Sequence, residues 1–232
     1  GLFVLGAVFL AFLLMVFGTR FPRAASGYQF SMAVKLLGNP VVLVAALALF
    51  CYVSLEASLN TWSKPYMTEM FGGDQNPNAV ANAGLVLSLF GVAMMAGRFL
   101  TSMVKNLTQI GVRLIAVMAL VAAAAILTMI LTTSPALAVV AVVLTGLAFA
   151  PIFPTIVGVT FAKFEPKLYG SIFGIIFSVG LLGATFVPKI VGNLSRGATI
   201  QQSLYIVFAM AVALFVIAMF LGSGSRKSGT AR

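Results

Sequence analysis

The fold is decided by residues 41–62, VVLVAALALFCYVSLEASLNTW. As a helix with a rise of about 1.5 Å per residue, this stretch is long enough to cross a hydrocarbon core about 30 Å thick. Its second half nevertheless contains a carboxylate, Glu56. An ionisable group inside a membrane helix costs at least about 2.5–3.5 kcal/mol, so it usually faces a cavity or a partner. The stretch therefore predicts a membrane-spanning helix with a polar position on one face.

The composition of the 232-residue chain is that of an integral membrane protein. Hydrophobic residues make up 61% of the chain and charged residues 8%, and the mean hydropathy is +1.13. Soluble domains are about half apolar and about a quarter charged. The net charge of +10 must first be placed on the topology before it indicates a partner. We expect the lipid bilayer as a partner and no nucleic acid.

Residues for acid–base or metal chemistry are scarce. Histidine is absent, which removes the commonest general base and metal ligand. The single cysteine, Cys51, lies inside a predicted span, so it supports neither a disulfide framework nor a metal site. The sequence predicts no catalytic residue, no metal, no cofactor and no enzymatic activity.

Seven apolar segments predict an all-α bundle with seven membrane spans. Residues 1–17 are apolar from the first position and lack a basic leader, so we interpret them as the end of a span and not as a signal peptide. The other six spans are expected at 41–62, 80–104, 110–133, 135–161, 168–190 and 203–221. The chain then divides into residues 1–17, a connector at 18–39, a six-helix unit at 40–222 and a basic tail at 223–232.

Two connectors carry recognisable local signals. In residues 18–39, four apolar residues at helical spacing predict a short interfacial helix before Pro40 opens the next span. Those four are Phe30, Ala33, Val34 and Leu37. Residues 63–79 are expected to form the connector after the Glu56 helix, with turn signals at Gly72-Gly73 and Asn76-Pro77.

The positive charges gather on one side when the spans alternate across the membrane. Only Lys64, Lys189 and Arg196 lie on the opposite side. The eleven on the first side are Arg20, Arg23, Lys35, Arg98, Lys105, Arg113, Lys163, Lys167, Arg226, Lys227 and Arg232. By the positive-inside rule, the connector at 18–39 and the C-terminal tail are expected in the cytoplasm, with the chain in the cell membrane.

The spans differ in what they are expected to face. Residues 114–131 and 204–221 contain no Gly or Pro and no charge, which is typical of lipid-facing helices. The third, fifth and sixth spans are rich in Gly or Pro, and Pro151 and Pro154 interrupt the fifth. Small residues let helices approach closely, and the carbonyls freed by Pro need protein or water. We expect these three to be inner helices.

A polar stripe follows one face of the Glu56 helix. Tyr52, Glu56 and Asn60 stand at positions i, i+4 and i+8, and Trp62 or Phe50 offers an aromatic ring. A carboxylate, an amide and a phenol can hydrogen-bond a polyhydroxylated ligand, and a ring can stack on its apolar face. The alternative is that Glu56 pairs with Lys64 or a lipid headgroup. We favour the cavity role.

Arg98 also has two interpretations. Its place about a turn and a half from the cytoplasmic end of the third span favours a cation that complements the helix C-terminus and snorkels to the interface. The alternative is a role, with Gly97, in a cytoplasmic gate.

The chain resembles the C-terminal half of a major facilitator superfamily transporter, preceded by the last helix of the N-terminal half. Within that superfamily it is most similar to the fucose and glucose/galactose permease group. The residues that carry the resemblance are Tyr52-Val53-Ser54-Leu55-Glu56, Trp62, Tyr66, Gly97-Arg98, Lys105, residues 146–155 and residues 169–188. Ser54 departs from the group's usual Gly.

The resemblance implies two six-helix halves with a substrate between them near the membrane midplane, and alternating access by rocking of the halves. Tyr52, Glu56 and Trp62 would be cavity residues, Gly97 and Arg98 gate residues, and a missing N-terminal six-helix half would complete the cavity.

The functional hypothesis is secondary active transport of a small polar solute, and we favour a monosaccharide with proton symport. Glu56 is the candidate for the coupling or sugar-binding residue. One alternative keeps the fold but exports drugs or organic anions, because Met67, Met70, Met94 and Met95 suit varied ligands. Another is a non-transporting seven-helix receptor or scaffold.

Overall fold

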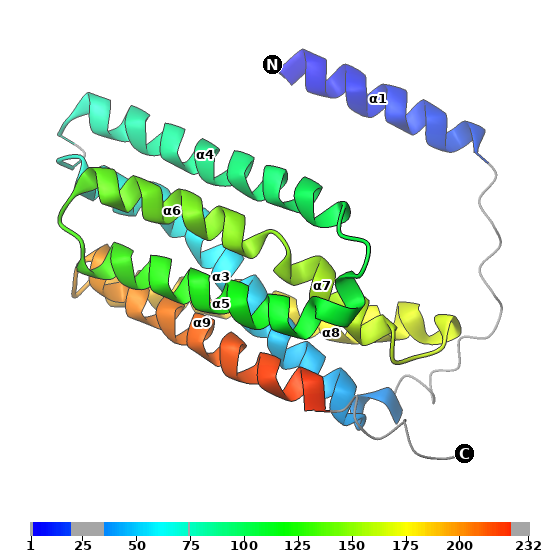
Figure 1. The fold of residues 1–232 in the computed structure, drawn as a ribbon. Coiled ribbons are helices and arrows are strands. Elements are labelled where there is room, and N and C mark those ends of the chain that lie inside the picture. Colours follow the sequence, from blue (N-terminus) through cyan, green and yellow to red (C-terminus); the bar gives the residue numbers. More distant parts are fainter. Residues whose placement is uncertain (1, 20–34, 74, 224–232) are drawn as a thin grey trace.

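All regular elements in the part of the chain that the structure describes are helices. The computed structural model describes residues 2–19, 35–73 and 75–223 (Figure 1). The elements are α1 (Leu2–Gly18), α3 (Pro40–Met70), α4 (Pro77–Ser102), α5 (Leu107–Leu131), α6 (Pro135–Phe149), α7 (Ile152–Phe161), η1 (Pro166–Leu168), α8 (Tyr169–Ser195) and α9 (Ile200–Ser223). Six helical segments are long and apolar enough to cross a membrane, with α6 and α7 forming one of them, and α1 is a shorter apolar helix. The all-α fold class is confirmed.

Two helix starts follow the local sequence signals. Asn39 precedes α3 and its side-chain oxygen accepts a 2.9 Å hydrogen bond from the Val41 amide, while Pro40 occupies the first turn, where its missing N–H costs nothing. Asn76 and Pro77 repeat this arrangement at the start of α4. The turn predicted at Gly72 and Gly73 is confirmed, since both adopt positive φ values of 108° and 82°.

The predicted end of the Glu56 helix is wrong. The sequence placed it at Trp62, whereas α3 continues to Met70. Two polar residues of the predicted connector are buried in the bundle: Ser63 and Tyr66 are inaccessible, and the Tyr66 hydroxyl donates a 2.8 Å hydrogen bond to the Met129 carbonyl of α5. Tertiary contacts therefore extend the helix past Pro65. Glu56 consequently lies near the middle of α3, about 24 Å from Pro40 and about 21 Å from Met70 by helical rise.

The predicted interruption of the fifth span is confirmed. α6 ends at Phe149 and α7 begins at Ile152, with Pro151 between them. Pro154 falls in the first turn of α7, where a missing N–H is tolerated. The Pro151 carbonyl accepts hydrogen bonds from both the amide and the hydroxyl of Thr155, at 3.1 and 2.6 Å, so part of the broken ladder is repaired locally.

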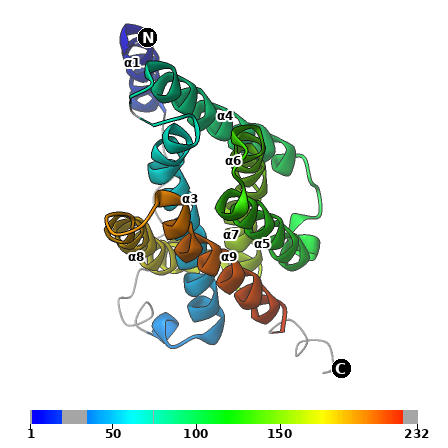
Figure 2. The same cartoon turned by 90° about the vertical axis from the view of Figure 1, so that its left-hand side faces the viewer.

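α3 is the central helix of the bundle and packs against α4, α6, α7, α8 and α9 (Figure 2). Its closest neighbour is α8, where a Cβ at Gly183 would overlap the Ser54 hydroxyl and lie 2.5 Å from the Phe50 carbonyl oxygen. Ser54 itself donates a 2.6 Å hydrogen bond to that carbonyl. The serine that departs from the family pattern is thus accommodated by a glycine on α8.

α1 packs little against the rest of the chain, whereas Leu36 of the connector is buried in the core. α1 lies apart from the six-helix bundle in Figure 1, and its large apolar side chains such as Phe3 and Met15 are exposed. The connector helix predicted around Phe30 to Leu37 falls largely outside the described residues, although residues 35–37 are helical. The tail at 223–232 likewise lies outside them, apart from Ser223.

Candidate functional site

An ion pair joins α3 to α4 beside the middle of α3. The Arg98 Nη2 atom donates a hydrogen bond to Glu56 Oε1 at 3.0 Å. The Glu56 side chain is 26% exposed and that of Arg98 46%, so each charge retains an open side. Arg98, and not the expected Lys64, forms the salt bridge with Glu56 in the described residues.

Tyr52 is the third member of the cluster. The same Arg98 nitrogen also donates to the Tyr52 hydroxyl oxygen, at 3.3 Å. Tyr52 lies one turn before Glu56 on α3 and is completely buried. The tyrosine therefore presents only its hydroxyl end to the ion pair and fixes the direction from which Arg98 approaches.

Aromatic rings surround Tyr52 on the bundle side. Phe149 and Phe153 stand on either side of the α6–α7 break, and the centroid of each ring lies 6.1 Å from that of Tyr52. Phe153 continues to Phe177 of α8 at 6.3 Å, and Phe149 to Phe90 of α4 at 6.2 Å. The rings on both sides of the helix break at Pro151 thus contact Tyr52, which is hydrogen-bonded to Arg98. A movement of α7 relative to α6 would therefore change the packing around Tyr52.

Asn60 and Trp62 occupy different surroundings. Asn60 is exposed one turn beyond Glu56, and its amide nitrogen donates a 2.9 Å hydrogen bond to the Glu56 backbone carbonyl. Trp62 is half-buried and directed at α8: its indole nitrogen donates a 2.9 Å hydrogen bond to the Pro188 carbonyl, and its ring packs over Gly192. The structure brings Tyr52, Glu56 and Arg98 together, and Asn60 continues the polar stripe one turn further along α3. Trp62 lies apart from this cluster, against α8.

Gly97 lies where α4 crosses the end of α6. A Cβ at this position would be 2.5 Å from the Ala150 Cβ and 3.4 Å from the Leu147 carbonyl oxygen. The absence of a side chain at Gly97 therefore permits a close contact between α4 and the start of the α6–α7 break. Arg98, the next residue on α4, reaches Glu56 on α3.

Sequence reasoning missed the Glu56–Arg98 pairing and the aromatic cluster. Both charges were singled out, but separately, and 42 positions separate them in the chain. A signal was present: two opposite charges in successive antiparallel spans, neither with a local partner, are expected to find one another. Phe149 and Phe153 carried no such signal, because phenylalanines are frequent throughout the chain.

The arrangement suits hydrogen bonding to a polar solute. The cluster supplies a carboxylate acceptor, a guanidinium donor and a hydroxyl, next to aromatic surface. In the described residues no group of three or more His, Cys, Asp or Glu side chains converges as metal ligands would.

Comparison with known proteins identifies the family. The model of the Major Facilitator Superfamily matches residues 1–188, so the chain belongs to the major facilitator superfamily. It is thus a member of a transporter family and not an enzyme, and this assignment argues against the receptor or scaffold alternative.

Three solved transporter structures, two of them of FucP, share the fold. FucP in the outward conformation is similar with a TM-score of 0.75 and 21% identity, covering 94% of this chain and 53% of FucP. A single-residue variant of the fucose:proton symporter FucP of E. coli gives 0.72 and 23%, covering 94% and 54%. A bacterial homolog of the human lysosomal transporter Spinster, inward-facing and unoccupied, gives 0.55 and 16%, covering 88% and 51%. No curated protein sequence matches significantly. The chain spans about half the length of these transporters.

Proposed function

We propose that this chain supplies the C-terminal half of a secondary active transporter that carries a monosaccharide together with protons by alternating access. The observation that carries the proposal is the Tyr52–Glu56–Arg98 cluster near the middle of α3, beside the broken α6–α7 helix. The fold likeness to FucP, described as a fucose:proton symporter, supports the solute class.

The cluster has a chemical match in a sugar. Glu56 can accept hydrogen bonds from hydroxyl groups, and Arg98 and Asn60 can donate hydrogen bonds to hydroxyl oxygens. The partly exposed Phe153 offers a ring to the apolar face of a pyranose. Trp62, hydrogen-bonded to Pro188 of α8, is assigned to the contact between α3 and α8 and not to solute binding. Glu56 is also the proton-coupling residue: when it is protonated, the ion pair with Arg98 weakens and both side chains become available to the solute.

The cavity is completed by a second six-helix half. Two helices that flank α3 display glycines with no atom within 4 Å of an added Cβ, namely Gly84 and Gly91 on α4 and Gly170 and Gly174 on α8. Small residues allow other helices to approach closely. Exposed apolar side chains accompany them, for example Leu89 and Leu182. We assign these faces to contact with the N-terminal half, whose last helix is α1.

Gating follows from the same geometry. Pro151 and Pro154 let α7 bend relative to α6, and Gly97 and Arg98 couple that bend to α3 and α4. The positive charges at the end of the bundle where α9 finishes support a cytoplasmic location for this end and for the tail, with the transporter in the cell membrane.

One observation favours a different solute. Almost half of the Arg98 side chain is exposed, so an organic anion is the second candidate. The methionine argument for a drug exporter is weakened, because Met67 and Met94 are buried and only Met95 is strongly exposed.

The test is transport by the full-length protein reconstituted in liposomes with an alkaline interior. Uptake of radiolabelled fucose is measured in competition with a panel of monosaccharides, small carboxylates and cationic dyes. Accumulation of a sugar that collapses with a protonophore supports the proposal. Competition by carboxylates or dyes alone, with no sugar effective, contradicts it.

A further inference from the structure

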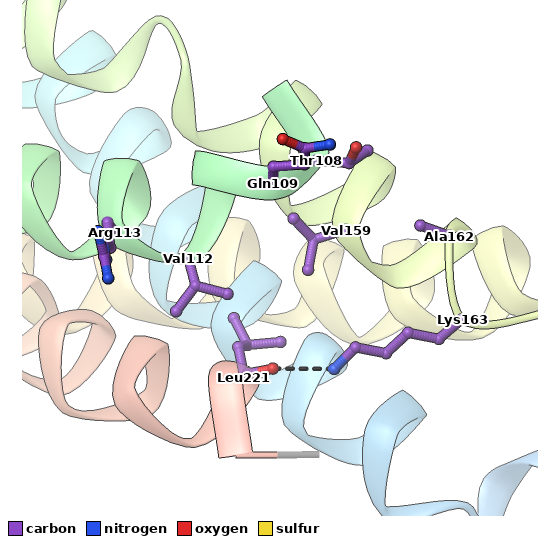
Figure 3. Close-up of a pocket in the computed structure, with 8 residues that line it drawn as sticks. All are labelled: Thr108, Gln109, Val112, Arg113, Val159, Ala162, Lys163 and Leu221. Atoms are coloured by element: carbon purple, nitrogen blue, oxygen red, sulfur yellow. Dashed lines mark hydrogen bonds between the residues drawn. The ribbon is translucent and has the colours of Figure 1, made fainter. Parts of the chain in front are cut away.

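A cavity with two cations in its lining lies at the end of the bundle, between α5, α7 and α9. It has a volume of about 370 Å³ and is lined by Thr108, Gln109, Val112, Arg113, Val159, Ala162, Lys163 and Leu221 (Figure 3). This volume falls in the range of small-ligand pockets. The α5 residues come from the first two turns of that helix, whereas Leu221 is near the end of α9.

Lys163 is held across the floor of this cavity. Figure 3 shows its side chain extending from the end of α7 to α9, where the Nζ atom donates a 2.8 Å hydrogen bond to the Leu221 carbonyl oxygen. Arg113 lies on the far side, with Val112 and Leu221 between the two cations. Thr108 and Gln109 add uncharged hydrogen-bonding groups at the rim.

Neither cation is neutralised. In the part of the chain that the structure describes, the salt bridges are Arg98–Glu56 and Lys167–Glu165, so neither Arg113 nor Lys163 has a carboxylate partner. Burial lowers the pKa of Lys163, because the ammonium loses water without gaining an anion. The same end of α5 adds the positive end of a helix dipole, and its N-cap residue Asn106 makes no side-chain cap hydrogen bond.

The walls of the cavity match a lipid. Part of the lining is apolar, namely Val112, Val159 and Leu221. Further along α5 and α9, large apolar side chains are exposed, for example Val117 on α5 and Val216 on α9. A ligand with an anionic head and an apolar body satisfies both features. Basic pockets between the ends of membrane helices are typical sites for anionic lipid headgroups.

We propose that this cavity binds the phosphate headgroup of an anionic phospholipid, with Lys163 and Arg113 as the cations that hold it. The inference depends on the membrane location of the family and not on the solute or the coupling ion. The lipid neutralises the two charges and joins the ends of α5, α7 and α9.

The test is lipid binding by the purified full-length protein, followed by native mass spectrometry and thermal unfolding in a neutral detergent. Phosphatidylglycerol is expected to bind and to raise the melting temperature, whereas phosphatidylcholine is not. Lys163→Gln and Arg113→Gln should each weaken binding about fivefold, the loss expected for one basic residue near a membrane surface. Lys163→Arg should retain binding.

A matched control is Lys105→Gln, which removes a positive charge from the connector at the same end of the bundle but outside the cavity. It should bind phosphatidylglycerol like the wild type. Equal weakening by Lys105→Gln, or unchanged binding by both cavity variants, would overturn the proposal. So would a Lys163-dependent stabilisation by inorganic phosphate equal to that by the lipid, since it would indicate a soluble anion.

Discussion

Arg98, beside the middle of α3, and Lys163, at the end of the bundle, are both partly buried cations with different partners. Arg98 is paired with Glu56 at 3.0 Å and also contacts Tyr52. Among the described residues, Lys163 donates to a backbone carbonyl and has no carboxylate partner. Deep charges must be compensated by the protein, whereas a charge at a membrane surface can be compensated by lipid. On our proposals, the Arg98 site functions when its internal ion pair with Glu56 breaks, whereas the Lys163 site binds an external anion.

The largest effect is expected from Arg98→Gln, which removes the cation from the central pair. Hydrogen bonds to charged groups are worth about 1.5–3 kcal/mol, so transport should fall on the order of ten- to hundredfold. Initial uptake rates in liposomes, normalised to the amount of inserted protein, measure this. Arg98→Lys keeps the charge but loses the planar fork, and should recover part of the rate. Rates close to wild type for Arg98→Gln would erase the distinction between the two cations.

A smaller effect is expected from Tyr52→Phe, which keeps the ring against Phe149 and Phe153 but removes the hydroxyl that contacts Arg98. A net hydrogen bond contributes about 0.5–1.5 kcal/mol, which corresponds to a loss of about two- to tenfold in transport. Concentration dependence of uptake measures it. Tyr52→Leu serves as the comparison, because it also removes the aromatic contacts and should be worse. An identical loss in both variants would show that the hydroxyl has no role.

The double variant Arg113→Gln/Lys163→Gln sharpens the comparison from the other side. These residues share no partner with Glu56 and Arg98, so in phosphatidylcholine liposomes transport should change by less than about twofold. The assay is the same uptake measurement with the same normalisation. A loss as large as that of Arg98→Gln would mean that the end cavity belongs to the transport machinery.

The smallest effect concerns the pH dependence of stability. Burial lowers the pKa of Lys163 from its usual 10.5, so between the lowered pKa and 10.5 the unfolded chain binds more protons than the folded one. Stability must then rise with pH across that window. The melting temperature of the wild type in neutral detergent should rise more steeply there than that of Lys163→Gln. Parallel curves for the two proteins would remove the pKa argument.

Much of the fold could be predicted from the sequence, because its signals are local. Hydropathy located the spans, Pro40 marked the start of α3, and Pro151 located the helix break. The end of α3 could not be predicted, since Ser63 and Tyr66 are polar in sequence and become buried only through contact with other helices. Length and hydropathy describe a residue's own segment and not the neighbour that covers it.

The candidate site was predictable by residue but not by pairing. Glu56, Tyr52 and Arg98 stood out because polar groups are costly inside membrane helices. The contact between Glu56 and Arg98 depends on the packing of α4 against α3, which no local signal in the sequence reveals. The hydrogen bond from the Trp62 indole to the Pro188 carbonyl could not be predicted either, because its acceptor is a backbone carbonyl far away in the sequence.

The central claim is that Glu56 couples solute movement to protons through its pair with Arg98. The most direct measurement compares wild type and Glu56→Gln in proteoliposomes, recording both sugar accumulation driven by a proton gradient and sugar exchange without a gradient. The account predicts that the wild type accumulates sugar, and that the variant still exchanges sugar or binds it but no longer accumulates it. Gradient-driven accumulation by Glu56→Gln equal to that of the wild type would contradict the claim.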